Sequence, residues 1–158
     1  MKRPIILAGM LGGVVWAVAT LVIGARIAVP IAMIQPVLMG AVFAPGLVLM
    51  AMIARMAQRR FFDDSLIDGQ PPAGAALIDQ KVLTNTVEQL ALALCIWPLA
   101  GFLLGAGTVL VLGVAFALAR LLFWVGYHLS PPLRGFGFAA SFYPTVAAAG
   151  WMLWQLVT

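Results

Sequence analysis

The chain has little charge for its length. Nine lysines and arginines and five acidic residues make up 9% of its 158 residues, and 64% of the chain is hydrophobic. Soluble domains carry about 25% charged residues. This shortage excludes an ordinary soluble domain and predicts an integral membrane protein. The basic residues are spread over the ends of hydrophobic runs and form no phosphate-binding patch, so we expect no nucleic-acid partner.

Cysteine and histidine are almost absent. Cys95 is the only cysteine, which excludes an intrachain disulfide, and it lies in an apolar run where a thiol usually behaves as a small hydrophobe. His128 is the only histidine, so the chain offers no cysteine and histidine cluster for a metal, and we expect none to be bound. Beside Tyr127, His128 is interpreted as a side chain at the membrane surface.

Long hydrophobic runs dominate what remains. Because they are continuous and do not alternate, they predict helices and exclude a membrane β-barrel. The first run is longer than the apolar part of a signal peptide and can cross the bilayer. We therefore predict an all-α integral membrane helical bundle, with residues 1–158 forming a single transmembrane domain. The five expected transmembrane helices cover residues 4–25, 35–56, 79–99, 102–128 and 136–157.

The stretch 57–78 is the only substantial loop expected, and it is either a solvated connector or a lid over a site. Asp79 would cap the helix that follows it. With five crossings, the basic residues at the start of the chain, after the second run and around the later runs all fall on one side, and Arg26 alone falls on the other. The positive-inside rule makes the first side cytoplasmic. We expect a bacterial inner (plasma) membrane with the active side facing the cytoplasm.

Two polar stripes interrupt the apolar helices. Lys81, Asn85 and Glu88 share one helical face, and Arg120 and Tyr127 share a face of the next helix. A short connection makes these helices antiparallel neighbours, so Glu88 and Arg120 reach a similar depth. An unpaired charge there would be costly, and the simplest expectation is an ion pair between them that fixes helix packing.

A structural pair does not account for the other polar residues gathered at the same membrane end. Lys81, Asn85, Tyr127 and Arg134 add cationic donors, an amide and a phenol. Such a set suits a small zwitterionic ligand that carries more negative than positive charge. A channel is a weaker reading, because no continuous polar face runs through any single helix.

These residues resemble the signatures of a known family. Asn85-Thr86-Val87-Glu88, preceded by the basic Lys81, is similar to the Arg-x-x-x-Asn-x-x-Glu signature of MAPEG, the membrane-associated proteins in eicosanoid and glutathione metabolism. The second signature resembles residues 119–127, Ala-Arg-Leu-Leu-Phe-Trp-Val-Gly-Tyr, followed by Arg134. The resemblance spans roughly residues 36–157, and the first expected helix is an addition to the usual four.

The resemblance implies a homotrimer that binds glutathione between adjacent subunits near the cytoplasmic surface. It assigns Arg134 and Tyr127 as catalytic residues, with Arg134 stabilising the glutathione thiolate. The glutathione-binding residues would be Lys81, Asn85, Glu88, Arg120 and Phe123. A hydrophobic electrophile would approach from the lipid, which makes the expected activity a glutathione-dependent transferase or peroxidase.

Some positions depart from the family pattern. Lys81 stands in place of the arginine, and Gln89 and Phe123 stand where eicosanoid-type members often have tyrosines. Lysine lacks the planar fork with which arginine grips a carboxylate. These departures keep a second function open, in which the protein is a non-catalytic membrane ligand-binding or scaffold protein of the same fold.

Overall fold

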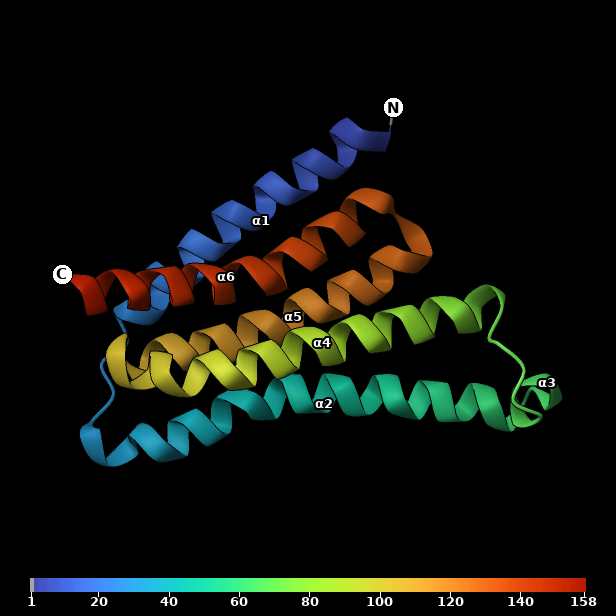
Figure 1. Ribbon diagram of the computed structural model, residues 1–158, viewed down its shortest axis with the longest axis horizontal. Coiled ribbons are helices and arrows are strands. Elements are labelled where there is room, and N and C mark those ends of the chain that lie inside the picture. Colours follow the sequence, from blue (N-terminus) through green and yellow to red (C-terminus); the bar gives the residue numbers. More distant parts are fainter. Residues whose placement is uncertain (1) are drawn as a thin grey trace.

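The computed structural model describes residues 2–158, except the side chains of Lys2, Arg3 and Ile5. Over this part of the chain it is all-helical, with 89% of residues in helices and no strands. The helices run back and forth along one common direction, and the two ends of the chain lie at opposite ends of the bundle (Figure 1). They are α1 (Lys2–Ala25), η1 (Ile31–Met33), α2 (Ile34–Phe61), α3 (Asp64–Ile67), α4 (Gly74–Leu103), α5 (Ala106–Leu129) and α6 (Pro131–Val157).

Short connections fix the neighbours of α5. Gly105, at a φ of 96°, lies between α4 and α5 in a backbone conformation that favours glycine, and so allows a very tight turn. Ser130 is extended between α5 and α6, and Pro131 opens α6 at a position where proline is well suited. The expected antiparallel contact between the helices that carry the two polar stripes is therefore confirmed.

Two helices are longer than hydropathy alone indicated. The second expected helix continues to Phe61, and the third begins at Gly74. Hydropathy marks the length that can lie in lipid, whereas a helix continues beyond it while its residues favour helix, as those from Ala57 to Arg60 do. The connector is consequently shorter and contains α3, which Asp63 caps by accepting from the Ser65 backbone N–H. Asp79 lies inside α4 and is not its cap.

The protein is an integral membrane protein by the length and composition of its helices. Four helical stretches are long and apolar enough to cross a bilayer: Ile6–Ala25, Ile31–Phe61, Gly74–Leu103 and Ala106–Leu129. Many large apolar side chains on their outer faces, such as Val15, Met39 and Leu118, are exposed. In lipid this exposure is favourable, since the acyl chains are themselves apolar.

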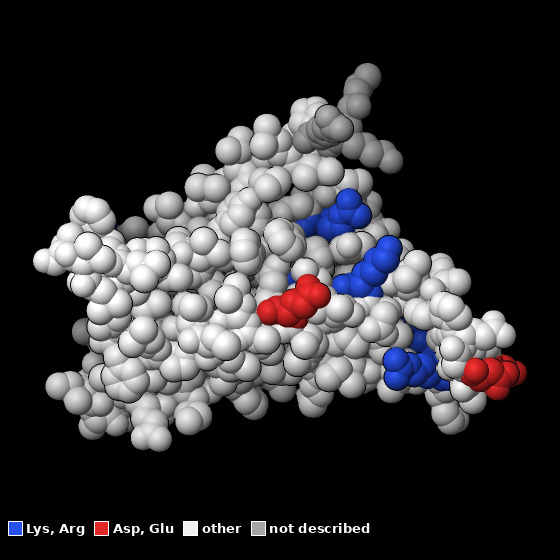
Figure 2. Space-filling view, viewed as in Figure 1, with Lys and Arg blue, Asp and Glu red and all other residues white. Residues whose placement is uncertain are grey.

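Most of the charged residues lie towards one end of the bundle, where α2 and α5 finish and α4 and α6 begin (Figure 1). We call this the basic end, and it carries Arg55, Arg59, Arg60, Lys81 and Arg134. Figure 2 shows the blue side chains towards this end and a red group near the middle of the same face, while the opposite end of that face shows neither colour.

Two apolar clusters hold the bundle together. One, nearer the basic end, includes Met52, Val82 and Phe123. The other, towards the opposite end, is built around Trp97 and Phe116, whose rings meet edge to face with centroids 5.8 Å apart. These clusters join α2, α4 and α5 into the frame on which the polar side chains are placed.

Gly113 offers a test of how closely this frame is packed. A Cβ at this position of α5 would lie 1.9 Å from the Ala41 carbonyl oxygen of α2, whereas a Cβ at Gly40 meets nothing within 4 Å. We expect Gly113→Ala to lower unfolding stability by about 1–3 kcal/mol, because α2 backbone must move. Gly40→Ala should leave stability unchanged or raise it by about 0.5–1 kcal/mol. Unfolding in mixed micelles measures both, and equal effects would contradict this packing.

Candidate functional site

A cavity of about 460 Å³ lies towards the basic end, between α1, α4, α5 and α6. Asn85 of α4, Tyr127 of α5 and Arg134 of α6 supply its polar groups. The remaining lining residues, which are mostly apolar, are Ile6, Met10, Phe123, Gly135 and Phe138. The cavity therefore brings together four of the seven residues expected from the sequence: Asn85, Phe123, Tyr127 and Arg134.

Glycines bring α5 and α6 close enough to place these groups. A Cβ on Gly126 would lie 2.4 Å from the Arg134 backbone nitrogen, and one on Gly137 would lie 2.5 Å from the Phe123 backbone nitrogen. Only glycine at both positions permits this separation of the helices. The Tyr127 ring and the Arg134 guanidinium consequently face each other across a distance of 4.9 Å from ring centroid to Cζ.

Two aromatic rings of α5 lie between two guanidinium groups beside this cavity. The Arg120 guanidinium lies 4.0 Å from the Phe123 ring centroid, and Phe123 meets Tyr127 edge to face at 5.0 Å. Arg134 then covers the outer face of Tyr127. Guanidinium groups are attracted to the negative faces of aromatic rings, so this sequence of contacts holds both rings and both cations in place.

Arg120 does not reach the cavity. Its side chain has no solvent exposure, and both terminal nitrogens donate to the Asn85 Oδ1 at 3.2 Å. Because the Asn85 amide oxygen faces Arg120, the amide nitrogen of Asn85 points away from it and donates to the Glu88 Oε2 at 3.3 Å. The expected Glu88–Arg120 ion pair is wrong: among residues 2–158 no carboxylate lies within salt-bridge distance of Arg120, and Asn85 stands between the two groups.

The amide of Gln89 extends the network into α6. Gln89 is buried, accepts from the Ser141 hydroxyl at 2.7 Å and points its own nitrogen at the Asn85 Oδ1 at 3.5 Å. One chain of polar contacts thus links α6, α4 and α5 around Asn85. In sequence, Gln89 was visible only as a departure from tyrosine, and nothing indicated its bond to Ser141.

Lys81 and Glu88 lie outside the cavity. Both are exposed on the helical face that also carries Asn85, and neither lines the space between α4, α5 and α6. Their stripe was expected to point into a single pocket. The structure separates it into a half-buried inner member, Asn85, and two outer members on the surface of the chain.

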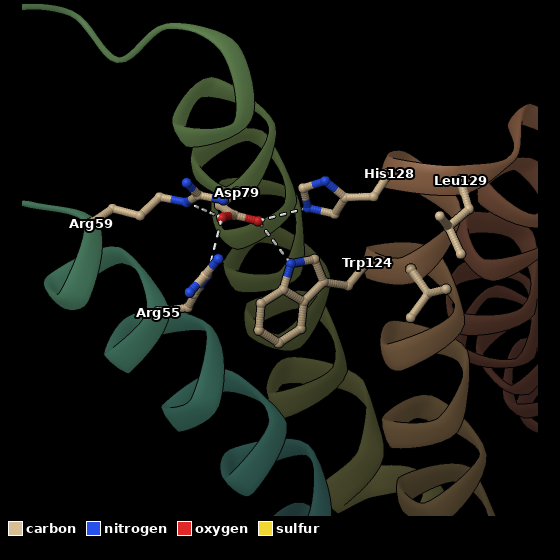
Figure 3. A pocket seen from close by; sticks show the side chains of 7 residues that line it. Arg55, Arg59, Asp79, Trp124, His128 and Leu129 are labelled. Carbon is tan, nitrogen blue, oxygen red and sulfur yellow. Dashed lines mark hydrogen bonds and ion pairs between the residues drawn. The ribbon is translucent and has the colours of Figure 1, made fainter.

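Sequence reasoning missed a second polar cluster at the basic end, centred on Asp79 (Figure 3). Asp79 is only 3% exposed and accepts hydrogen bonds from Arg59 of α2 and Trp124 of α5, the latter at 2.9 Å. His128 meets its Oδ1 at 2.9 Å, and the Arg55 Nε is 3.7 Å away. His128 is therefore bonded to this carboxylate and is more than a surface side chain. The available signal was spacing: Arg55 with Arg59, and Trp124 with His128, stand one helical turn apart.

The model of the MAPEG family matches residues 33–154. This stretch contains α2, α4, α5 and most of α6, and it includes every cavity residue except Ile6 and Met10. No curated protein and no solved structure matches the chain. The family resemblance drawn from the two signatures is thus confirmed over most of the chain, and α1 lies outside the matched stretch.

Mutation distinguishes the contributions of Asn85 and Glu88 to the stability of the protein. Asn85→Leu removes the acceptor of a fully buried guanidinium, and we expect unfolding stability in detergent to fall by about 3–5 kcal/mol, as when a buried charge loses its partner. Glu88→Gln should change stability by only about 0.5 kcal/mol, because this side chain is exposed and does not pair with Arg120. If Glu88→Gln costs as much as Asn85→Leu, the two charges interact more directly than the structure shows.

Proposed function

Because the chain belongs to the MAPEG family, we propose that it is a glutathione-dependent membrane transferase or peroxidase acting on a hydrophobic electrophile. The observation that carries the proposal is the cavity in which Asn85, Tyr127 and Arg134, from three helices, face apolar residues of α1, α5 and α6. A cavity with polar groups on one side and apolar groups on the other suits a reaction between a polar thiol and a hydrophobic electrophile.

Arg134 would supply the charge that the chemistry needs. The thiolate is the nucleophile, and a nearby guanidinium favours it over the thiol. Arg134 lies in the first turn of α6, but Pro131 and Pro132 have no backbone N–H, so this helix start offers few donors for an anion. The side chain of Arg134 must therefore provide most of the stabilisation, with the Tyr127 hydroxyl as a second donor.

The proposed transfer step is a simple displacement. The glutathione thiol loses its proton to solvent, the thiolate sulfur bonds to the electrophilic carbon, and the leaving group departs with its electron pair. Asn85 would bind the peptide part of glutathione. Arg120, which is buried behind the cavity wall, would act as a positioning residue by holding the Asn85 amide.

Lys81 and Glu88 support a proposal that the protein is a homotrimer with glutathione near the subunit boundary. Glu88 lies near the middle of α4 and is exposed. A charge in the centre of a bilayer costs about 2.5–3.5 kcal/mol on insertion scales, and contact with a neighbouring subunit or a bound polar ligand would remove that cost. On this proposal the outer part of the α4 stripe binds the carboxylates and amine of glutathione once the subunits assemble.

We also propose that α6 is a fifth crossing. It has 27 residues and packs lengthwise against α1 and α5, although it is not among the four stretches that are long and apolar enough to cross a bilayer by composition. Five crossings keep all of the basic end on one side, which the positive-inside rule makes cytoplasmic. A bacterial inner membrane, with glutathione supplied from the cytoplasm, is the setting that we propose.

The alternative proposal is a non-catalytic membrane protein that binds an anionic ligand in the same cavity. Two observations favour it. Phe123 provides no hydroxyl where a tyrosine would, and Lys81 is exposed and outside the cavity. A ligand could then be held by Arg134 and Asn85 without any activation of a thiol.

Arg134 distinguishes the two proposals. Purified protein in detergent should bind glutathione and give the ultraviolet absorbance band of a thiolate. Arg134→Ala should abolish the band, because the cation that favours the thiolate is gone, and Arg134→Lys should retain part of it. Failure of the wild-type protein to bind glutathione at millimolar concentration would overturn the enzyme proposal.

α1 forms the apolar wall of the cavity. Gly9 and Gly13 press against the backbone of α6, so that a Cβ on Gly9 would lie 2.7 Å from the Pro132 carbonyl oxygen. This contact holds Ile6 and Met10 at the cavity. The helix that lies outside the family match therefore supplies much of the surface that a hydrophobic substrate would touch.

Met10 tests this assignment. Met10→Phe should lower turnover of a bulky electrophile about tenfold relative to a small one, since pocket contacts of this size are worth about 1–3 kcal/mol. Glutathione binding should be unchanged, because Met10 offers no polar group to the peptide and belongs to the apolar lining of the cavity. The matched control is Leu11→Phe, at an exposed α1 position that does not line the cavity. If both variants alter selectivity equally, α1 does not shape the substrate side.

A further inference from the structure

The Asp79 cluster lines a second cavity, of about 420 Å³, that the proposed reaction does not use. Trp124 and His128 of α5 face it, whereas Phe123 and Tyr127 face the first cavity. Successive residues of an α-helix differ in direction by about 100°, so the two cavities open on different sides of α5. The second is therefore a separate feature of the basic end.

Charge in this cavity does not balance. Asp79 is the only carboxylate that lines it, against the guanidiniums of Arg55 and Arg59 and the imidazole of His128. Asp63 lines an adjacent hollow and stands outside this cavity, and among the described residues it forms no ion pair with either arginine. The cavity consequently retains net positive charge and attracts an anion.

Arg55 and Arg59 also have hydrogen-bond donors that are not used within the described residues. Arg59 uses its Nε for Asp79, and its terminal nitrogens have no partner within residues 2–158. The Arg55 Nη1 donates to the Gln58 Oε1 at 2.6 Å, and its Nη2 has no hydrogen-bond partner among the described residues. Their side chains are 22% and 44% exposed, respectively. Asp79 holds both guanidiniums at the cavity, and their terminal nitrogens without a partner are donors of the kind that bind phosphate.

The other side of the cavity is apolar. Val125 and Leu129 line it and are exposed, and the Trp124 ring extends from α5 towards Asp79 (Figure 3). These residues lie near the ends of α2 and α5 and near the start of α4. The ends of spanning helices are the parts that reach the headgroup region of a bilayer. Basic pockets between helices at this level suit anionic lipid headgroups.

We propose that this cavity binds an anionic phospholipid. The lipid phosphate would accept hydrogen bonds from Arg55 and Arg59, and an acyl chain would lie along Val125 and Leu129. Asp79, Trp124 and His128 form the rigid base of the site. This assignment is independent of glutathione chemistry, since none of its residues lines the first cavity.

Native mass spectrometry of the full chain tests the proposal. Protein in micelles that contain equal amounts of dioleoylphosphatidylglycerol and dioleoylphosphatidylcholine should retain the anionic lipid preferentially. Arg55→Gln with Arg59→Gln should reduce this retention about tenfold, because the charge-assisted bonds to phosphate are lost. The matched control, Arg60→Gln, removes the same charge from the next residue, which does not line the cavity, and should retain the lipid. Equal retention of both lipids, or equal loss in the control, would overturn the proposal.

Two further measurements address the source of the phosphate and the folding of the variants. Glycerol 1-phosphate at millimolar concentration should not displace the lipid; displacement would show a site for a soluble phosphate ester and overturn the assignment to lipid. In wild-type protein, phosphatidylglycerol with brominated acyl chains should quench tryptophan fluorescence more than brominated phosphatidylcholine. The excess should vanish in Trp124→Phe, and equal quenching by the two lipids in the wild type would contradict the proposal even if the arginine variants do not fold.

Discussion

The contact between Arg120 and Asn85 is the constraint on which the site depends. A guanidinium without solvent exposure lies in an apolar helix, and its two terminal nitrogens share one amide oxygen. Its Nε has no hydrogen-bond partner among the described residues, and the face of Phe123 covers part of its charge. Such a group is stable only if its surroundings are held rigidly, because loss of one contact leaves a buried charge uncompensated. The closely packed glycines of α5 and α6 provide that rigidity.

Much of this arrangement could be predicted from the sequence, because membrane helices reveal themselves by composition and polar side chains by their spacing. Asn85, Tyr127 and Arg134 were expected at one membrane end for that reason, and the family resemblance added Phe123. All four line one cavity. The error over Glu88 has a physical origin. Depth along two antiparallel helices can be read from spacing, but rotation about their axes cannot. A rotation of α4 about its axis, by less than the angle between successive residues, decides whether Asn85 or Glu88 meets Arg120.

Asp79 was misread for a related reason. Hydropathy placed it at a helix boundary, where a carboxylate would cap the first turn, but α4 begins at Gly74 and carries Asp79 into the bundle. There it is surrounded by donors from α2 and α5, which no local pattern around residue 79 could show. Long-range contacts of this kind become predictable only when the facing helices are considered together. The one-turn spacings of Arg55 with Arg59 and of Trp124 with His128 were the available indication.

α5 joins the two polar regions into one mechanical unit. Its Phe123 and Tyr127 face the first cavity, and the adjacent Trp124 and His128 face Asp79. A rotation of α5 that improved one set of contacts would disturb the other, so the carboxylate of Asp79 helps to fix the direction in which Tyr127 points towards Arg134. α1 completes the first cavity from outside this frame, through glycine contacts with α6. The polar half of the cavity thus belongs to the stretch that matches the family, and part of the apolar half comes from α1, which lies outside that stretch.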